Sequence, residues 1–301
     1  MNSNECERTM GELDPPFLVD NKDSLRSPVV FCSPHSGRVY PQTFLDQSNL
    51  SPDALRKSED YFVDCLFEPA AKALGAPLLK ACFPRAFLDV NREPYELDAC
   101  LFDEPLPEFA NPHTPRVAGG LGTIARIVAD GENIYRDKLT LDDAMARVEV
   151  LYKPFHGALR DLLDTRLANF GTCVLIDCHS MPSASMLTSG NTRPDIVLGD
   201  RFGASCDGTL PALITSYMEN LGYSVQANRP YAGGFITEHY GRPANGCHAI
   251  QIEINRGLYV NEATFEPTLG YRRLARDLKE VAIKLAKDLP LISGHGREAA
   301  E

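Results

Sequence analysis

The chain has 301 residues, of which 44% are hydrophobic and 24% are charged, as is ordinary for a globular protein. Its formal net charge of -11 argues against nucleic acid and anionic membrane surfaces as partners. An anionic ligand could bind only where Arg side chains or a metal ion make the local field positive.

The ends of the chain differ in character from its middle. Residues 1–16 are polar and acidic, which predicts a flexible lead rather than a signal peptide. Residues 291–301 are expected to form a frayed tail, and residues 17–290 a single α/β domain. The nine cysteines include no Cys-x-x-Cys pair and predict free thiols in a reducing compartment. No apolar run is long enough to cross a bilayer, so a cytoplasmic location is expected.

Short apolar runs alternate with amphipathic segments along the middle of the chain. Such runs predict buried strands, and they lie at residues 29–32, 78–83, 173–177, 196–198, 223–227 and 249–254. Apolar residues at three- and four-residue steps predict a helix from Leu141 to Leu167, with a kink at Pro154. Further helices are expected over 209–222 and 267–289. This alternation implies a largely parallel sheet with helices on both faces, and in such sheets ligands bind beyond the carboxyl ends of the strands.

Two histidines occupy matching places on two of the predicted strands. His35 follows the run 29–32, and His179 follows the run 173–177. Two imidazoles at neighbouring strand ends can converge on one ion, as in three-ligand catalytic zinc sites. Asp177 could then accept a hydrogen bond from an imidazole N–H. The alternative is that each histidine, and Asp177 as a backbone cap, is purely structural.

A third metal ligand would be a carboxylate, and Glu59 and Asp60 are the candidates from the sequence. They are expected to open a helix whose apolar face includes Val63 and Leu66. Acidic residues in a first helical turn also interact favourably with the helix dipole, which is the simpler interpretation of this pair.

Basic and amide side chains follow the second predicted strand. Asn91 and Arg92 present an amide and a guanidinium together, and Arg85 lies seven residues before Arg92. Because guanidinium pairs with carboxylate through two hydrogen bonds, this segment suits an anionic substrate. A structural salt bridge is the alternative.

Glu253 stands within the last predicted strand, between isoleucines. A buried carboxylate is costly unless it is paired, hydrogen-bonded or protonated, and such residues often serve as acids and bases. The alternative is a core ion pair with Arg256 or Arg85.

A loop with paired glycines, Gly233 and Gly234, also precedes this strand. Its Thr237 and His239 could donate hydrogen bonds to a ligand, although a plain turn would explain the glycines.

Six of these segments resemble, in order, the N-formylglutamate amidohydrolase family. They are SPHSGRVYP, KSEDYFVD, DVNREP, DCHSMPS, GGFITEHYG and HAIQIEINRGLY, and they extend from about residue 29 to 262. The family looks like a branch of the zinc carboxypeptidase and aspartoacylase-like group. That resemblance implies a three-layer α/β/α domain around a mixed, largely parallel sheet. It also implies metal-dependent hydrolysis of N-formyl-L-glutamate to formate and L-glutamate, a chemistry of histidine degradation.

The resemblance also assigns roles residue by residue. It implies His35 and His179 as zinc ligands, Asn91 and Arg92 as the pair that binds a substrate carboxylate, and Glu253 as the catalytic base. Arg38 stands where the wider group has its Glu ligand, three residues after His35. Asp60 is therefore expected to complete the site, with Glu59 as the alternate.

Other features implied by the resemblance are less specific. Arg85 and Arg256 are expected to assist Arg92, and Gly234 and Thr237 are expected to contact the substrate. One Zn²⁺ per chain is expected, while another divalent metal stays open because ligand type selects metals weakly. Two alternatives also remain, the same mechanism acting on another small N-acyl amino acid and a catalytically silent carboxylate-binding protein. The sequence does not determine the oligomeric state.

Overall fold

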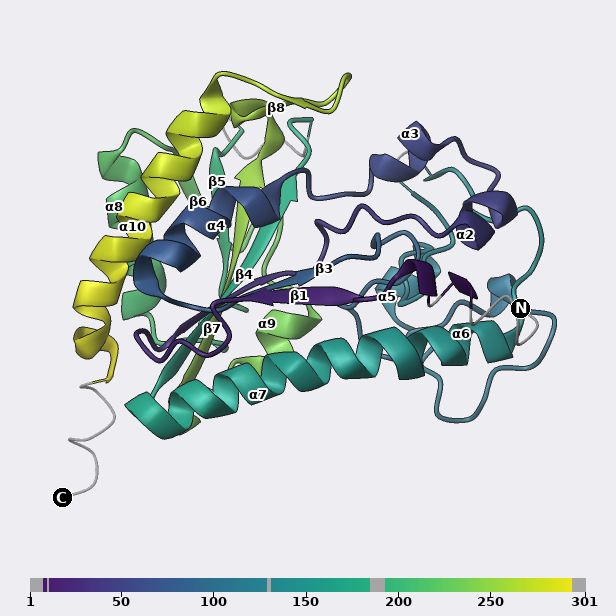
Figure 1. The fold of residues 1–301 in the computed structure, drawn as a ribbon, viewed down its shortest axis with the longest axis horizontal. Helices are drawn as coiled ribbons and strands as arrows, with labels where there is room; N and C mark the ends of the chain where they lie inside the picture. Colours follow the sequence, from purple (N-terminus) through teal and green to yellow (C-terminus); the bar gives the residue numbers. More distant parts are fainter. Residues whose placement is uncertain (1–7, 10, 129–130, 185–192, 294–301) are drawn as a thin grey trace. The chain divides into compact units, whose positions relative to one another are not determined.

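A computed structural model describes residues 8–9, 11–128, 131–184 and 193–293 (Figure 1). The chain divides into two compact units. Unit 1 comprises Met1–Leu18, Pro34–Glu59 and Lys80–Leu159, and unit 2 comprises Val19–Ser33, Asp60–Leu79 and Arg160–Glu301. The single domain expected over 17–290 stays a prediction.

A seven-stranded sheet in the order β1-β3-β2-β4-β7-β5-β6 organises the fold. The pairs β2–β4, β4–β7 and β5–β6 are parallel, whereas β5 runs antiparallel to β7. The prediction of a mixed, largely parallel sheet is therefore confirmed. The strands are β1 (Phe17–Asp20), β2 (Val29–Ser33), β3 (Leu78–Ala81), β4 (Cys173–Met181), β5 (Ile196–Gly199), β6 (Val225–Ala227) and β7 (Cys247–Asn255).

The central strands β4 and β7 have one apolar face and one face that carries polar side chains. Successive residues of a strand point to opposite faces of the sheet, and the two strands pair in register. Ile176 and Cys178 of β4, and Ile250 and Ile252 of β7, belong to the hydrophobic core. The residues that alternate with them point to the other face, and these are Asp177, His179, Gln251 and Glu253.

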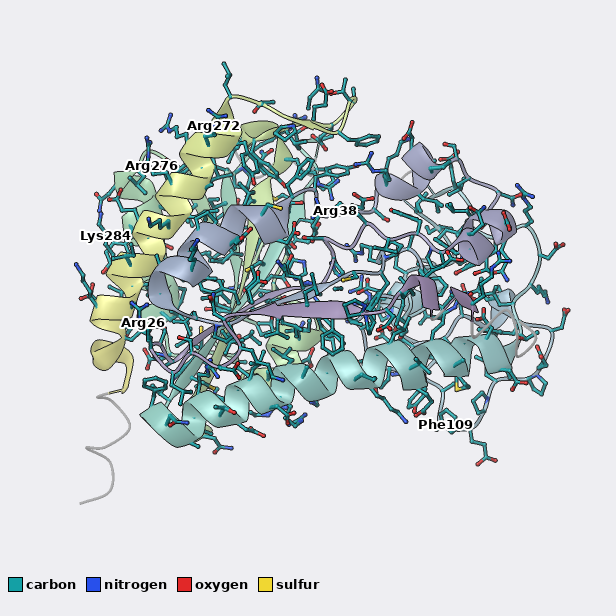
Figure 2. All side chains as sticks on the ribbon, viewed as in Figure 1. Arg26, Arg38, Phe109, Arg272, Arg276 and Lys284 are labelled. Atoms are coloured by element: carbon teal, nitrogen blue, oxygen red, sulfur yellow. The ribbon has the colours of Figure 1, made fainter. Side chains whose placement is uncertain are left out.

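Three helices cover the apolar face of the sheet in unit 2: α4 (Val63–Leu74), α8 (Thr209–Asn220) and α10 (Gly270–Ser293) (Figure 1). Leu274, Leu278 and Leu285 of α10 are buried in the core, while Arg276 and Lys284 lie on its exposed side (Figure 2). This separation follows the predicted helical period.

The short helix α9 (Phe235–Tyr240) lies on the opposite face and contacts β4 and β7. Helices therefore lie on both faces, as the sequence predicts. Unit 2 is completed by the 3₁₀ helices η4 (Pro243–Asn245) and η5 (Arg256–Leu258) and by the antiparallel strands β8 (Val260–Asn261) and β9 (Glu266–Pro267).

Short helices and loops make up most of unit 1. The helices are α2 (Gln42–Gln47), α3 (Pro52–Arg56), the 3₁₀ helix η1 (Ala99–Leu101), α5 (Pro115–Ala118), α6 (Leu141–Arg147) and the π-helical turn η3 (Val148–Tyr152). The helix α7 (Lys153–Phe170) begins in this unit.

The long helix expected over 141–167 is interrupted differently from the prediction. The structure has the π-helical turn η3 between α6 and α7, directly before Pro154. The backbone N–H of Lys153 donates to the carbonyl of Val148, five residues earlier. Proline donates no hydrogen bond and its ring crowds the preceding turn, and the wider π turn accommodates it.

The described parts of the two termini extend the predicted elements. Thr9 and Leu13, within the expected flexible lead, are buried, and the hydroxyls of Thr9 and Thr43 are 2.6 Å apart in unit 1. The helix α10 continues to Ser293, which is beyond its predicted end at residue 289. Residues 1–7 and 294–301 lie outside the described residues. Among the helices that the structure describes, none is long and apolar enough to span a membrane.

A fully buried guanidinium, that of Arg147, joins several parts of unit 1. Arg147 is 0% exposed and forms an ion pair with Asp143 one turn earlier. It also donates to the Phe87 carbonyl over 3.0 Å and to the Tyr135 hydroxyl over 2.8 Å. Asp143 and Tyr135 together raise the pKa of Arg147 despite its burial, so the side chain stays charged. Through Phe87, this network supports the segment that carries Asp89, Asn91 and Arg92.

Replacement of Arg147 by Met is expected to lower the free energy of unfolding by about 3–5 kcal/mol, because it leaves the Asp143 carboxylate buried without its cation. Urea denaturation measures this loss. The exposed Arg136 provides a matched control, since R136M should change stability by less than about 0.5 kcal/mol. A loss below about 1 kcal/mol in R147M would show that the ion pair is dispensable.

Candidate active site

His35 lies two residues after β2, in a tight loop at Gly37. A Cβ atom on Gly37 would lie 1.9 Å from the Phe83 carbonyl oxygen, so only glycine permits this approach of two backbone segments. His35 is 2% exposed, and its Nε2 atom lies 2.7 Å from Oδ1 of Asp89. The ring orientation is therefore set by a buried carboxylate, and Nδ1 is the nitrogen with which His35 would bind a metal.

Asp89 is the centre of a charged cluster in unit 1. Its Oδ2 atom lies 2.7 Å from Nη2 of Arg85 and 3.6 Å from Nη2 of Arg92, and its Oδ1 accepts from the backbone N–H of Asn91. Burial would raise the pKa of the Asp89 carboxyl, but the Arg85 and Arg92 guanidiniums and His35 outweigh burial and hold it well below its usual range. Asp89 is therefore ionised.

The Asn91–Arg92 pair is held in place mainly by backbone groups. Arg92 donates from Nε to the Leu121 carbonyl and from Nη1 to the Asn91 carbonyl, each over 2.9 Å. The cluster has two guanidiniums for one carboxylate, Asp89, so it provides local positive charge in a chain whose net charge is -11. An anionic substrate requires such a region.

His179 lies within β4 and not just beyond it. The observed strand extends to Met181, whereas the predicted strand ends at residue 177. Its Nδ1 atom lies 2.9 Å from Oδ2 of Asp60, and its Nε2 atom lies 2.9 Å from Oδ1 of Asp177. Burial would lower the pKa of His179, but Asp177 and Asp60 outweigh burial and raise it well above its ordinary value. The Asp177 carboxylate therefore lies next to the imidazole ring, and its role as hydrogen-bond acceptor stays a prediction.

Asp60 precedes the helix α4 instead of opening it. The helix begins at Val63, after Phe62 adopts a left-handed conformation with φ of 55°. The prediction that Glu59 and Asp60 form the first turn is therefore wrong, and the helix dipole does not explain them. Asp60 is 1% exposed, and its Oδ1 accepts from the Ser180 hydroxyl over 3.2 Å and from Arg256 over 3.4 Å.

Arg256, expected to contact the substrate or to pair with Glu253, is buried beside Asp60. Besides that ion pair, its Nε donates to the Ser180 hydroxyl over 3.1 Å, and its guanidinium lies 4.7 Å from the centroid of the Tyr61 ring. These contacts indicate that Arg256 orients Asp60. Its role in substrate binding remains a prediction.

Glu59, the alternate carboxylate ligand, has a different environment. Its Oε1 accepts from the Tyr40 hydroxyl over 2.8 Å and from Nε of Arg56 over 3.3 Å. Burial raises the pKa of the Glu59 carboxyl and outweighs the opposing effects of Tyr40 and Arg56. Between the two acidic residues, the contacts favour Asp60 as the ligand.

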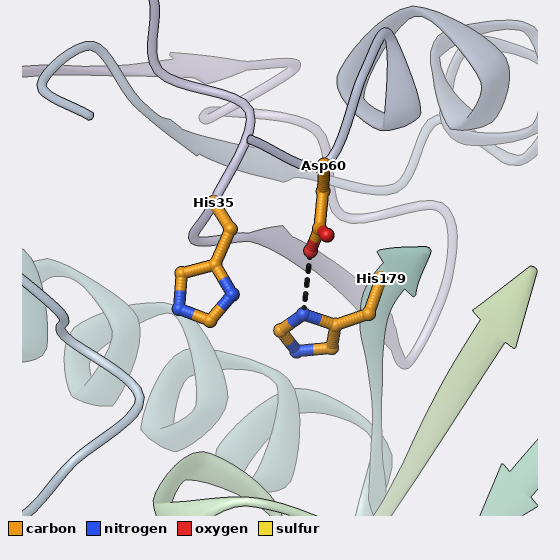
Figure 3. A group of neighbouring side chains, drawn as sticks. All are labelled: His35, Asp60 and His179. Atoms are coloured by element: carbon orange, nitrogen blue, oxygen red, sulfur yellow. Dashed lines mark hydrogen bonds and ion pairs between the residues drawn. The ribbon is translucent and has the colours of Figure 1, made fainter. Parts of the chain in front are cut away.

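His35, Asp60 and His179 each offer one ligand atom, and these atoms all lie within 4.8 Å of one another (Figure 3). Two imidazoles and one carboxylate, all buried, form a donor set that suits a catalytic zinc ion. Each imidazole also has a carboxylate at its other nitrogen, Asp89 or Asp177, as ligating histidines usually have. The three residues could therefore hold a metal ion.

Glu253 lies beside His179 on the polar face of the sheet, because the two residues are register partners in the parallel pair β4–β7. It is 7% exposed. Its Oε1 accepts a hydrogen bond of 2.7 Å from Nε2 of Gln251, a residue that our sequence reasoning missed. The signal was the alternation of Gln251 and Glu253 with isoleucines, which predicts that both share one face of a buried strand.

The glycine-flanked loop leads into α9 on the same face. The backbone N–H of Gly234 donates to Gln251 over 2.8 Å, and the Thr237 hydroxyl donates to Asp177 over 3.3 Å. Nη2 of Arg160 and Nε2 of His239 are 2.8 Å apart. The loop is therefore tied to residues around Glu253 and His179, while contacts of Gly234 and Thr237 with a substrate stay predictions.

Comparison with known proteins shows which family this chain resembles. A model of the N-formylglutamate amidohydrolase family matches residues 27–260. An N-formylglutamate deformylase of Pseudomonas putida is 29% identical over 271 residues, which make up 88% of this chain and 92% of that protein. The enzyme of the same name from Pseudomonas aeruginosa is 29% identical over 268 residues, 88% of this chain and 91% of its own.

Solved structures extend the comparison to the fold. The crystal structure of N-formylglutamate amidohydrolase from Ralstonia eutropha JMP134 matches with a TM-score of 0.86 at 34% identity, covering 92% of this chain and 99% of that chain. A gene product of Agrobacterium tumefaciens shares the fold with a TM-score of 0.67 at 19% identity, over 91% of this chain and 96% of its own.

The fold and the site thus define an α/β protein with a candidate three-ligand metal centre and a buried carboxylate in register with one ligand. The chain belongs to the N-formylglutamate amidohydrolase family, as the six sequence segments indicated.

Proposed function

We propose that this chain hydrolyses N-formyl-L-glutamate to formate and L-glutamate with the help of a divalent metal ion, of which zinc is the first choice. The observation that carries the proposal is the register of Glu253 with His179, whose ring is hydrogen-bonded to Asp60. This arrangement brings a buried carboxylate and one potential metal ligand, His179, to one face of a sheet, and a second potential ligand, Asp60, contacts His179. Family membership and the names of the relatives support the substrate.

His35, Asp60 and His179 would hold the ion. A bound zinc ion supplies a water molecule of lowered pKa, near 7, and polarises a carbonyl oxygen. Asp89 and Asp177 hold the two imidazole rings in the required orientation. Arg256 and Ser180 do the same for the Asp60 carboxylate.

Glu253 would act as general base and then as general acid. It accepts a proton from the attacking water and delivers it to the leaving amine. A carboxylate suits this exchange because the amine nitrogen must be protonated as the C–N bond breaks. Glu253 is held by a side-chain hydrogen bond from Gln251.

Basic and amide side chains of unit 1 are assigned to bind the carboxylates of the substrate. Arg92, assisted by Arg85 and Asn91, would bind carboxylates of the glutamyl group through charge-assisted hydrogen bonds. The two guanidiniums exceed the single negative charge of Asp89 between them, which leaves net positive charge for the substrate. Gly234 and Thr237, which lie in the loop before α9 and in α9, are proposed to contact the substrate.

Formate release from the purified protein tests the proposal. The chain is loaded with about one equivalent of zinc per site, and the rates with N-formylglutamate, N-formylaspartate and N-acetylaspartate are compared. We expect N-formylglutamate to be the best substrate. Removal of the metal with a chelator should abolish turnover, and added zinc should restore it.

Two outcomes would contradict the proposal in different ways. Comparable or faster turnover of the other acyl amino acids would show that the substrate is another small N-acyl amino acid. A metal-loaded chain that binds N-formylglutamate without hydrolysing it would show a binding protein.

The cytoplasmic location expected from the sequence belongs to the proposal, and fractionation of cells tests it.

A further inference from the structure

Gln251 connects the proposed catalytic base to the loop before α9. It lies on β7 two residues before Glu253 and is 4% exposed. Its Oε1 atom accepts from the backbone N–H of Gly234 over 2.8 Å, and its Nε2 atom donates to Oε1 of Glu253 over 2.7 Å. Both ends of the amide are therefore engaged within unit 2.

The hydrogen bond with Gly234 fixes which end of the amide faces Glu253. A backbone N–H can only donate, so the Gln251 atom that meets it must be the carbonyl oxygen. The –NH₂ group is then directed at Glu253, where it stabilises the ionised carboxylate. The terminal torsion of a glutamate is broad, so this bond gives the carboxylate an orientation that its own rotamer preference does not provide.

The position of Gly234 is in turn set by a close approach of the loop to β5. Gly199 is the register partner of Gln251 in the antiparallel pair β5–β7. A Cβ atom on Gly199 would lie 2.6 Å from the backbone nitrogen of Gly233 and 2.7 Å from the Ala232 carbonyl carbon. The loop therefore packs directly on the backbone of β5, which holds the Gly234 N–H above Gln251.

We propose that Gln251 is a positioning residue that holds the Glu253 carboxylate in its reactive orientation and couples that orientation to the loop containing Gly234. The inference rests on the proposed hydrolysis, since it concerns the same base. The inference goes beyond the proposed function in two ways. It assigns a role to a residue that does not act on the substrate, and it makes the orientation of the base depend on the loop.

Two substitutions separate the parts of this role. Q251M keeps the approximate volume and removes both hydrogen bonds. Q251E keeps the shape and an acceptor for the Gly234 N–H, but it presents an acceptor where Glu253 needs a donor. We expect each variant to lower kcat by about 10- to 100-fold, as is typical when a supporting contact is lost, with KM changed by less than about threefold. Q226M, on β6, is the matched control and should behave as the wild type.

A second measurement shows whether Gln251 acts through Glu253. When one residue acts through another, its effect vanishes once the other is removed. In an E253Q background, Q251M is therefore expected to change the residual kcat by less than about threefold. Zinc content and the thermal midpoint of each variant are measured alongside, and Q251E decides the question if Q251M does not fold.

Three results would overturn the inference. Wild-type kcat in Q251E would show that donation to Glu253 is unnecessary. Equal losses from Q251M with and without Glu253 would show that Gln251 acts elsewhere. Inactivity of the metal-loaded wild type would remove the proposed function and this inference together, whereas the first two results would leave the proposed function intact.

Discussion

Substitution of Glu253 by Gln is expected to lower kcat for N-formylglutamate by about 10²- to 10⁴-fold, the usual contribution of a general acid–base residue. Glutamine retains the shape and the buried position of Glu253 on β7, but it cannot take a proton from water. Because Arg85 and Arg92 are assigned to substrate binding, KM should change little. Steady-state formate release gives both constants, and calorimetric titration measures substrate binding to the inactive variant.

The exposed Glu219, at the end of α8, offers a control with the same change of charge. E219Q should retain wild-type kcat and KM. An E253Q enzyme with kcat within about threefold of wild type would exclude Glu253 as the base. Equal zinc content and an unchanged thermal midpoint in the two variants would show that a loss of activity comes from chemistry and not from misfolding.

The strands β2 to β7 could be predicted from the hydrophobic pattern, and the two histidines could be placed next to two of them, whereas β1, β8 and β9 were not foreseen. Runs of apolar residues such as 29–32 and 173–177 can be satisfied only inside a covered sheet, and β2 and β4 lie there. A side chain beside such a run lies at the strand end or on a known face. His35 and His179 were therefore placed without information on tertiary contacts.

The sequence analysis favours Asp60 as the third ligand, but it gives no physical reason to prefer it to Glu59, because the two are neighbours with the same chemistry. The left-handed residue Phe62 delays the start of α4 to Val63, and the contacts of each carboxylate then differ. Asp60 meets His179, whereas Glu59 meets Tyr40. These partners are distant in the sequence, so local propensity carries no signal for them.

The same reasoning explains why Asp89 and the π-helical turn were not foreseen. The role of Asp89 depends on His35, which is 54 residues away, and the sequence shows Asp89 only as an acid near two arginines. A proline within a helical pattern predicts a kink, but a π-helical turn relieves the same conflict. The choice between them depends on packing around Val148 and Tyr152, which are both buried.

Replacement of Asp60 by Asn is expected to reduce the zinc content from about one ion per chain to a small fraction of that value. The amide has the same shape and can still accept from Ser180 and Arg256, but it lacks the charge that a zinc ligand needs. Loss of a direct ligand should lower metal affinity by more than the about 100-fold that loss of an outer contact causes. Metal analysis after dialysis against a weak chelator measures the change.

The neighbouring Glu59 makes this experiment specific, because E59Q is the same kind of substitution one residue earlier. Its carboxylate contacts Tyr40 and Arg56, so E59Q should keep about one zinc ion per chain. If E59Q lost the metal and D60N kept it, the ligands would be His35, His179 and Glu59, and the contacts of Asp60 would be purely structural. Retention of zinc by both variants would mean that neither carboxylate binds the ion, and the candidate centre would then have only two protein ligands.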